Sequence, residues 1–312
     1  MSQIIYYMDQ ASDVWNRISK ITIEQAANSF VNTLSFHTRR NYITSFNKIF
    51  YIMSVGGTNI REMSIMDFSL MNLEAILDYI RDKLPGSVAT KQNRCSCFIS
   101  FTRYLERMSC GNFRMVKTQK GANATFKKIR EKAATKACTF QQWNQFIAEL
   151  RKISIRDWLI AKAIFQGAKR INEVLRSRIE NIDWEKNRIT YKQSKSDHLE
   201  KTTVITYPQE FMTDLKFYLN GRTEGYIFIT RNDLPVTQPQ AYRSFAYASV
   251  KAGLPFNIHP HMLRATAITQ FFGMGYHSDD IMKVSGHATN ATVLYYDKSK
   301  IEENLTTQVK LV

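Results

Sequence analysis

The N-terminal third of the chain is patterned for helices. In residues 35–55 the large apolar side chains recur three or four positions apart, which places them on one face of a helix. The same spacing recurs in three other stretches, residues 22–34, 71–84 and 88–108. We expect these helices to pack into a small all-helical domain over residues 21–110, preceded by an arm of residues 1–20.

The helical spacing is lost between residues 111 and 137. From Arg114 to Lys136 the chain carries eight lysines and arginines and a single acidic residue, Glu131. Because this segment has few large apolar side chains, it is either solvated or laid along a polyanion. We interpret residues 111–137 as a basic linker between two domains.

A mixed pattern extends over residues 138–297. Helical spacing predicts helices at about residues 140–150, 158–165, 209–219, 238–251, 261–272 and 290–296. Residues 182–208 instead alternate and are rich in β-branched side chains, which predicts a small antiparallel sheet with turns at 185–187 and 195–200. A further short strand is expected at 226–229.

These patterns together predict a mainly α protein with a small antiparallel sheet. The first domain is expected to be all-α and the second to be α+β. A tail of residues 298–312 follows the second domain.

The composition of the chain indicates that it binds a charged partner. The 312 residues carry a formal net charge of +16, and 12% of them are aromatic. This length fits two domains, and the excess of positive charge favours a polyanion, for which double-stranded DNA is the simplest candidate. An anionic membrane is the rival, but the chain has neither a long apolar run nor a signal-like N-terminus. We therefore expect a cytoplasmic protein that does not engage a membrane.

The cysteines predict no metal site. The chain has four of them, at Cys95, Cys97, Cys110 and Cys138. They form no C-x-x-C pair and have no pair of histidines nearby, so reduced and partly buried thiols are favoured over zinc ligands.

Residues 259–297, HPHMLRATAITQFFGMGYHSDDIMKVSGHATNATVLYYD, are the stretch best suited to chemistry. They carry two histidines, an arginine and a tyrosine, which together are poor core material and well suited to a phosphate: His261, Arg264, His287 and one of the adjacent pair Tyr295 and Tyr296. The first two lie one helical turn apart, so both can face one small anion.

The order of these residues is H-x-L-R, then G-H, then a tyrosine nine positions after that histidine. It resembles the C-terminal signature of the tyrosine recombinases, the phage integrase family. The pattern covers residues 139–297, and the N-terminal part matches only in its helical style. The segments IRDWLIA and ITYPQEFM further resemble plasmid-borne integrases. The resemblance implies an all-α DNA-clamping domain before an α+β catalytic domain, acting on plasmid or other mobile DNA.

The resemblance also implies a reaction without a metal or another cofactor. Tyr296 is expected to attack the scissile phosphate, giving a 3′-phosphotyrosyl link and a free 5′-hydroxyl, and a second DNA 5′-hydroxyl then reverses the step. Tyr296 is favoured because it follows His287 by nine residues. Its neighbour Tyr295 differs by about 100° around a helix, so only one of the two can face the site.

Arg170, in QGAKRINEVL, resembles the arginine of the family's first motif, in which an acid follows three residues later. That acid is Glu173, which is expected to hold Arg170. The sequence departs from the family pattern by one additional residue after Gly167, so Lys169 competes with Arg170 for this place. Arg170 and Arg264 are expected to bind the non-bridging phosphate oxygens.

Three further residues have roles implied by the resemblance. Lys195, in TYKQSKSD, resembles a catalytic lysine on the hairpin and is expected to protonate the leaving oxygen, with Lys192 and Lys201 as alternatives. His261 is expected to contact the phosphate or accept the tyrosine proton, unless it only caps its helix. His287 is a third phosphate ligand or proton relay, unless it is a buried histidine bonded to backbone.

Contacts to DNA phosphates are predicted for seven basic residues: Arg39, Arg40, Lys91, Arg94, Lys127, Lys128 and Arg130. Any single one of them is equally well explained as a solvated charge. Exchange between duplexes implies a tetramer on DNA and a monomer when free. Two other functions fit the sequence: a relaxing enzyme like the type IB topoisomerases, and a DNA-binding regulator of plasmid maintenance or copy number without catalysis.

Overall fold

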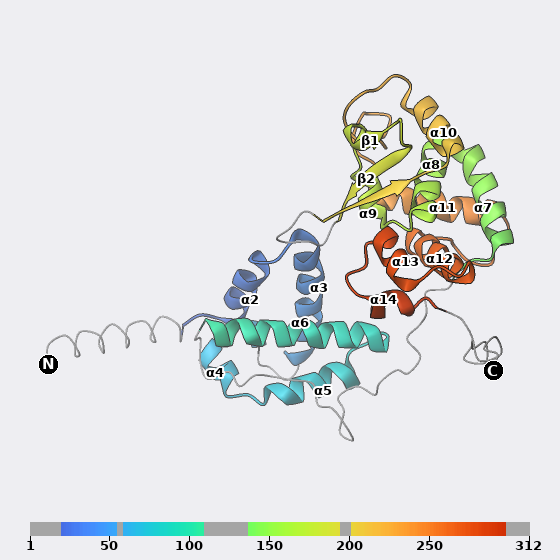
Figure 1. Ribbon diagram of the computed structural model, residues 1–312. Coiled ribbons are helices and arrows are strands. Elements are labelled where there is room, and N and C mark those ends of the chain that lie inside the picture. Colours follow the sequence, from blue (N-terminus) through green and yellow to red (C-terminus); the bar gives the residue numbers. More distant parts are fainter. Residues whose placement is uncertain (1–19, 55–58, 109–136, 194–200, 298–312) are drawn as a thin grey trace, which may run out of the picture. The chain divides into compact units, whose positions relative to one another are not determined.

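The computed structural model describes residues 20–54, 59–108, 137–193 and 201–297 (Figure 1). The chain divides into two compact units, Met1–Arg130 and Glu131–Val312, each with a core of its own. The predicted arm and tail and nearly all of the basic linker lie outside the described residues. So do four of the predicted site residues: Lys127, Lys128, Arg130 and Lys195.

The described part of the first unit is all helical. Its elements are α2 (Ile23–Asn32), α3 (Phe36–Met53), the 3-10 turn η1 (Ile60–Glu62), α4 (Ile65–Ser69), α5 (Leu73–Lys83) and α6 (Val88–Arg107). Helix α6 packs against α2, α3 and α5. Its Phe101 lies in an aromatic cluster, with ring centroids 5.8 Å from Phe30 and 5.2 Å from Phe46. The all-helical expectation is confirmed, whereas η1 and α4 are too short to show a helical period in the sequence.

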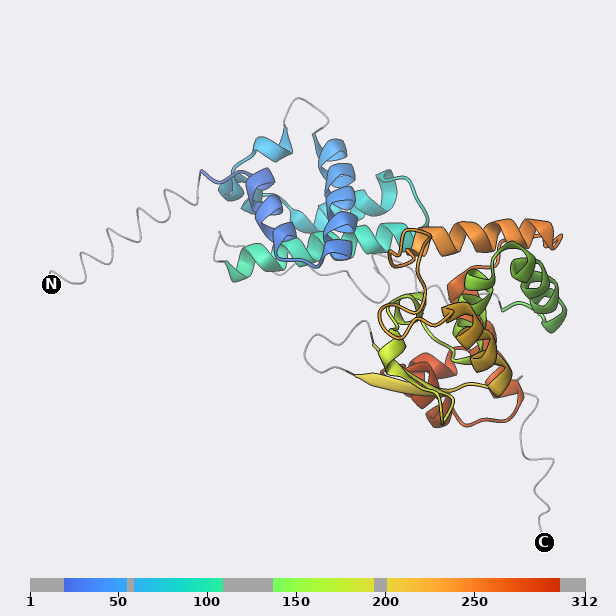
Figure 2. The same ribbon diagram turned by 90° about the horizontal axis from the view of Figure 1, so that it is seen from above.

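The second unit combines helices with one sheet (Figure 2). Its helices are α7 (Phe140–Ile153), α8 (Ile155–Gln166), α9 (Ile171–Leu175), α10 (Gln209–Leu219), α11 (Gln238–Lys251), α12 (Pro260–Gly273), α13 (Ser278–Ser285) and α14 (Asn290–Leu294), with a 3-10 turn η3 (Ile179–Asn181). The strands are β1 (Ile182–Asp183), β2 (Arg188–Lys192) and β3 (Thr202–Thr206). They are antiparallel and ordered β1-β2-β3. The predicted fold class, mainly α with a small antiparallel sheet, is confirmed.

Side-chain hydroxyls mark where the helices of this unit begin. Thr139 and Gln142 form a capping box at α7: Thr139 Oγ1 accepts from the Gln142 N–H at 3.2 Å, and Gln142 Oε1 accepts from the Thr139 N–H at 2.9 Å. Ser154 ends α7 and caps α8, where its Oγ accepts from the Asp157 N–H at 3.2 Å. These caps satisfy amide groups that the helix itself leaves unpaired.

Two tyrosines fasten the sheet to helix α8. Burial alternates along β2 and β3, so one face of the sheet is turned to the core. On that face Tyr191 and the buried Tyr207 share a hydrogen bond of 2.7 Å between their hydroxyl oxygens. The Tyr207 hydroxyl also donates to the Ala163 carbonyl on α8 at 3.1 Å. The hairpin is thereby fixed next to the end of α8, where the candidate site begins.

The prediction of a strand at residues 226–229 is wrong. Only isolated bridges occur there, between Arg178 and Tyr226 and between Ile229 and Pro235. The guanidinium of Arg222 donates to the Tyr226 and Ile227 carbonyls at 2.9 Å each, and these bonds take the place of a ladder.

Helices α9 and α13, which span five and eight residues, were not predicted from the sequence. None of the helices in the described parts of the chain combines the length and hydrophobicity that a membrane crossing needs.

Candidate active site

The turn between α8 and α9 presents Arg170. Helix α8 ends at Gly167, Ala168 has a positive φ of 46°, and Arg170 is the N-cap residue of α9. The buried carboxylate of Glu173 accepts two hydrogen bonds from Arg170, one from its backbone N–H at 3.0 Å and one from Nη1 at 2.8 Å. The structure thus brings the predicted pair together, and Glu173 fixes the direction of a guanidinium that stays partly exposed.

Arg264 enters the same place from α12. Its side chain is almost completely buried, with 2% exposure. Nη1 donates to the Ala168 carbonyl at 2.7 Å, and Nη2 lies 3.0 Å from Nε2 of His287. Burial, reinforced by the charge of Arg170, lowers the pKa of Arg264 to about 10. The guanidinium therefore remains charged at neutral pH.

Gly286 places His287 beside Arg264. Helix α13 ends at Gly286, whose φ is +68°. A Cβ atom there would lie 2.7 Å from Nε2 of Gln193, so both the backbone angle and the close approach of the hairpin favour glycine. The Gly286 carbonyl also lies 3.4 Å from Nη1 of Arg170, which donates to it.

The partners of His287 define its protonation. Nδ1 lies 2.7 Å from Ser285 Oγ, and Nε2 faces the Arg264 guanidinium. Because a guanidinium can only donate, Nε2 accepts, and Nδ1 carries the proton that is donated to Ser285. Burial and the charges of Arg264 and Arg170 lower the pKa of His287 to about 3. His287 is therefore neutral, and it is bonded to side chains rather than to backbone.

His261 is free of a capping role. The cap of α12 is His259, whose Nδ1 accepts from the Met262 N–H at 3.2 Å. His261 lies one turn before Arg264 with its side chain exposed. Desolvation of the ring beside the cavity, reinforced by the charge of Arg264, lowers the pKa of His261 and so favours its neutral, proton-accepting form.

The two tyrosines after α14 differ in their surroundings. The ring of Tyr296 packs against the cluster of α12 and α13, and its centroid lies 5.9 Å from that of His287. Tyr295 is 36% exposed, and its ring is turned 87° from that of Tyr296. Of the pair, Tyr296 is the one beside His287 and Arg264.

These residues lie at or beside one cavity. A cavity of about 290 Å³ is lined by Arg170, His261 and Arg264, together with Lys169. His287 joins this group through its contact with Arg264, and Tyr296 through its contact with His287. Segments far apart in the chain therefore meet at a concave and positively charged surface, which suits a phosphate.

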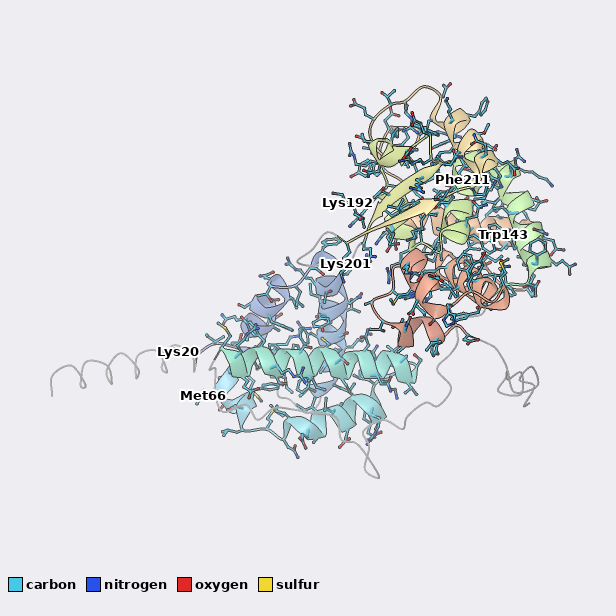
Figure 3. All side chains as sticks on the ribbon, viewed as in Figure 1. Lys20, Met66, Trp143, Lys192, Lys201 and Phe211 are labelled. Atoms are coloured by element: carbon cyan, nitrogen blue, oxygen red, sulfur yellow. The ribbon has the colours of Figure 1, made fainter. Side chains whose placement is uncertain are left out.

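The predicted lysine of the hairpin is not part of the described structure, but its neighbours are. Lys195 lies between β2 and β3, outside the described residues. Lys192 and Lys201, the alternatives, lie at the end of the strand pair that leads to it (Figure 3). The Gln193 N–H donates to the Lys201 carbonyl at 2.8 Å, which continues the pairing towards this loop.

The role of Lys169 in the site was not predicted from the sequence. Lys169 appears there only as a competitor of Arg170, yet its side chain is fully buried and lines the cavity. The only signal in the sequence is the departure from the family pattern between Gly167 and Arg170. Ser285 was also missed, because a serine two residues before a histidine has no distinctive pattern.

The predicted phosphate contacts of the first unit fall into two groups. Arg39 and Arg40 are exposed on α3. Lys91 and Arg94 on α6 are half-buried, and each donates at 2.6 Å to a backbone carbonyl at the end of α5 or just after α5, those of Arg81 and Pro85. All four remain predictions, but the second pair already has structural contacts.

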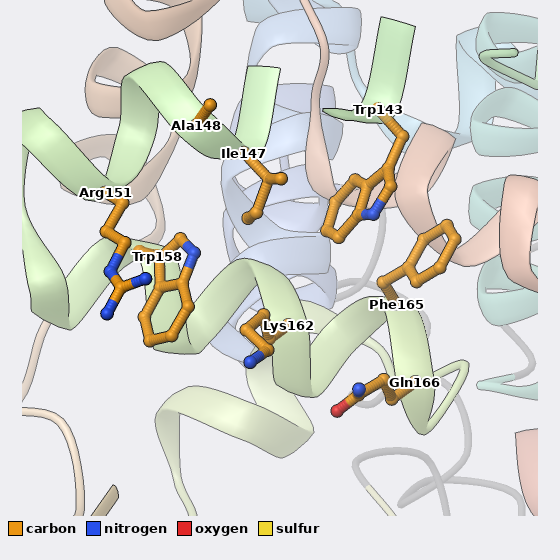
Figure 4. A pocket seen from close by; sticks show the side chains of 8 residues that line it. All are labelled: Trp143, Ile147, Ala148, Arg151, Trp158, Lys162, Phe165 and Gln166. Carbon is orange, nitrogen blue, oxygen red and sulfur yellow. The ribbon is translucent and has the colours of Figure 1, made fainter. Parts of the chain in front are cut away.

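Another cavity of the second unit has a different character. It measures about 320 Å³, lies between α7 and α8, and is walled by aromatic rings (Figure 4). Arg151 and Lys162 lie over the ring of Trp158, at 4.8 and 4.3 Å from its centroid. It holds no pair of acid and base groups, so the chemistry is assigned to the first cavity. Among the described residues, no group of three or more histidine, cysteine and carboxylate side chains is placed to hold a metal ion.

Comparison with known proteins identifies the family of the chain. The sequence model of the phage integrase family matches residues 136–303. The virulence plasmid integrase pGP8-D of Chlamydia trachomatis is 38% identical over 303 residues, which cover 96% of this chain and 90% of that protein. The chain belongs to the phage integrase family. The family predicted from the sequence is therefore confirmed.

Other members are more distant. The virulence plasmid integrase pGP7-D of Chlamydia trachomatis is 31% identical over 282 residues, covering 88% of this chain and 91% of that protein. The integrase of the transposon Tn1549, solved in complex with a circular intermediate DNA, matches with a TM-score of 0.69 at 14% identity, over 90% of this chain and 97% of that one. The recombinase XerH, solved on its difH substrate, has a TM-score of 0.63 at 18% identity, over 85% and 76%. At this level of identity, the two structures show that this chain has the same fold as they do.

Proposed function

We propose that this phage integrase family member is a site-specific recombinase that cuts and rejoins double-stranded DNA through a 3′-phosphotyrosyl link at Tyr296. The observation that carries the proposal is the arrangement around Arg264. Its guanidinium is bonded to His287, whose ring lies beside Tyr296, while Arg170 and His261 line the same cavity. The names of the chlamydial relatives support plasmid or other mobile DNA as the substrate.

In the proposed first step the phenol oxygen of Tyr296 attacks phosphorus. The bond between this oxygen and phosphorus forms as the bond between phosphorus and O5′ breaks. Negative charge gathers on the non-bridging oxygens, and the guanidiniums of Arg170 and Arg264 are placed to bind them. Fixed donors of this kind stabilise the transition state more than the ground state.

Two protons have to move during this step. The phenol loses one, for which the neutral ring of His261 is a suitable acceptor at the cavity. The leaving O5′ gains one, and Lys195 is the proposed donor. In the second step a 5′-hydroxyl of another strand attacks the phosphotyrosine and restores the phenol. The number of phosphoester bonds is conserved, so the reaction requires no nucleotide.

Trapping the covalent link tests this proposal. The substrate is a duplex selected from a random pool for tight binding, nicked close to the cleavage site so that the freed end diffuses away. We expect the wild-type chain to form a denaturation-resistant adduct whose peptide map places the DNA on Tyr296. Tyr296→Phe removes only the phenol oxygen, so it should bind the duplex with unchanged affinity and form no adduct.

Tyr295→Phe is the matched control, because it removes the same atom from the neighbouring and more exposed ring. It should keep most of the adduct formation. An adduct on Tyr295 would overturn the assignment. No adduct in the wild type would favour the regulator of plasmid maintenance, and relaxation of supercoiled DNA without strand exchange would favour the topoisomerase-like enzyme.

Exchange between two duplexes further leads us to propose a tetramer on DNA, formed in the cytoplasm from a chain that is monomeric when free. Light scattering should give the mass of one chain for the free protein and of four chains with two duplexes for the complex. A single chain per duplex at saturation would contradict the tetramer while leaving the cleavage chemistry intact.

A further inference from the structure

Lys169 is a buried charge that the proposed chemistry does not use. It directly precedes Arg170, and its side chain has no exposed surface. Its Nζ donates to Thr203 Oγ1 on β3 at 2.6 Å and lies 5.7 Å from the ring centroid of Tyr191 on β2. Lys169 therefore ties the turn that carries Arg170 to strands β2 and β3.

The surroundings of Lys169 are unusual for an ammonium group. The titratable and charged groups that face it come from every element packed around it: Arg170 and Glu173 of α9, Arg264 of α12, His287 after α13, Tyr191 of β2 and Tyr207 after β3. Among the described residues, no carboxylate forms a salt bridge with Lys169, because Glu173 is bonded to Arg170.

Burial is the main reason why the pKa of Lys169 falls to about 7. The carboxylate of Glu173 opposes this effect, and the charges of Arg264 and Arg170 add to it. Near neutral pH the free protein therefore holds Lys169 as a mixture of amine and ammonium. Two buried cations, Lys169 and Arg264, beside the partly exposed Arg170 and a single carboxylate would be costly in free energy, and the neutral amine reduces that cost.

We propose that Lys169 is a positioning residue that takes up a proton when a DNA phosphodiester occupies the cavity. The proposal rests on the proposed function, because it needs the scissile phosphate beside Arg170 and Arg264. The phosphodiester brings one negative charge, which favours the ammonium form, and the proton comes from water. No covalent bond changes at Lys169.

The proton also strengthens the contact with the hairpin. A charged donor forms a stronger hydrogen bond than a neutral amine, so the bond from Nζ to Thr203 tightens when the phosphate is present. Strand β3 is then held against the turn of Arg170. Lys169 thereby couples occupation of the cavity to the position of the strand that leads from Lys195.

Linkage gives the pH dependence its sign. Below the free pKa, Lys169 is charged with or without DNA, and the affinity for DNA does not depend on its proton. As pH rises from about 7, the free form loses the proton while the bound form keeps it, so the affinity falls, by at most about tenfold per pH unit for one proton. The affinity for DNA stops falling once the pH exceeds the pKa that Lys169 has in the DNA complex.

Calorimetry of DNA binding tests the proposal directly. The full chain carrying Tyr296→Phe is titrated with the selected duplex in two buffers of different ionisation enthalpy, which gives the number of protons bound. We expect uptake of about half a proton or more at about pH 7.5. Lys169→Met keeps the apolar stem and should lose this uptake.

Lys162→Met is the matched control. Lys162 is a mostly buried lysine of the same unit that packs on the Trp158 ring, and it lines the other cavity (Figure 4). This variant should take up the same fraction of a proton as its parent. Equal uptake in the Lys169→Met and Lys162→Met proteins would assign the proton to another group and overturn the proposal, as would no uptake in the parent.

A second measurement does not depend on how well Lys169→Met folds. In protein with ¹³Cε-labelled lysine, one resonance should titrate near the pKa of about 7 and move in Thr203→Val. With the duplex bound it should keep its ammonium position to about pH 8. Titration of Lys169 near the ordinary lysine pKa of about 10 would overturn the proposal. Neither measurement needs cleavage, so a failed adduct experiment and a failed Lys169 proposal are separate results.

Discussion

The guanidinium of Arg264 is held almost entirely out of water, and no carboxylate in the described residues forms a salt bridge with it. Its hydrogen-bond partners are the Ala168 carbonyl and the neutral ring of His287. A buried cation with neutral partners costs free energy, and the lowered pKa of Arg264 is the expression of that cost. A guanidinium has five N–H donors, so donors remain for a phosphate, whose charge offsets the cost.

Arg264→Lys tests whether the fork of donors or only the charge matters. Lysine keeps a positive charge but cannot span the Ala168 carbonyl, His287 and a phosphate with one planar group. We expect adduct formation on the nicked duplex to slow by about 100-fold or more, comparable to the loss of an oxyanion donor. The measurement is the single-turnover rate, with thermal unfolding recorded alongside.

Arg222→Lys is the control for this variant. Arg222 also donates to two backbone carbonyls of the same unit, those of Tyr226 and Ile227, but it lies outside the cavity. Both variants should lower the unfolding temperature by a few degrees, through about 1 kcal/mol or more of lost hydrogen bonding. Only Arg264→Lys should slow the reaction. Equal slowing in both would mean that Arg264 acts through stability alone.

At this scale the order of motifs in the sequence was enough to bring Arg170, Arg264, His287 and Tyr296 to one place. The burial of each side chain could not be predicted from this order, because burial depends on which segments of the chain pack together. The sequence therefore offered no sign that Lys169 has no exposed surface, or that His259 rather than His261 caps α12.

Helix α13 and the β2–β3 hairpin meet at Gly286, and this contact positions two residues of the site. The Gly286 carbonyl accepts from Arg170, and the next residue is His287. On the hairpin side, Gln193 and Thr203 lie where a Cβ atom on Gly286 would meet them, at 2.7 and 3.4 Å. A displacement of this single turn would therefore move groups from α9, α13 and the hairpin at once.

Gly286→Ala should reveal this coupling. Alanine at φ of +68° costs about 1–2 kcal/mol, and its Cβ would push Gln193 aside, with 2.7 Å to Nε2. We expect a lower unfolding temperature and a slower rate of adduct formation. Gly275→Ala is the control, since φ is +82° and no other atom lies within 4 Å of the added Cβ. It should lose similar stability with little change in rate, and an equal loss of rate would refute the positioning role of Gly286.

Long elements were predictable and short ones were not. The helices at 209–219 and 238–251 have the predicted bounds, because each carries several turns of apolar spacing. The five residues of α9 carry little more than one turn, and α13 little more than two. Residues 226–229 have a composition typical of a strand, but they form none, and Arg222 donates hydrogen bonds to two of their carbonyls.

At the scale of the whole molecule, the chain consists of two units with separate cores, and its net charge is +16. In the sequence, the basic segment 111–137 separates the residues of the two cores, and most of it lies outside the described residues. If both units and this lysine- and arginine-rich segment contact DNA, as the proposed function implies, phosphate contacts dominate the binding. Counterion release then makes the affinity steeply dependent on salt.

The contribution of the linker to this dependence can be measured. Lys127, Lys128 and Arg130 are replaced together by alanine, and the dissociation constant for a duplex is measured over a range of salt. If each contacts a phosphate, the slope of log Kd against log salt should decrease by about 2.5 to 3, because each contact contributes about 0.9. The loss of affinity should be the same for selected and random sequences, since phosphates carry no sequence information.

The control removes the same charge elsewhere. Lys152, Arg178 and Lys283 are exposed and each is paired with an acidic side chain, at 2.6, 2.8 and 3.0 Å. Their joint replacement by alanine lowers the net charge by the same three units, and it should leave the slope nearly unchanged because these cations already have counterions on the protein. A slope that falls equally in both triple variants would attribute the salt dependence to net charge. A slope that falls in neither would mean that the basic segment is solvated in the complex, and the phosphate contacts would then have to come from the two units alone.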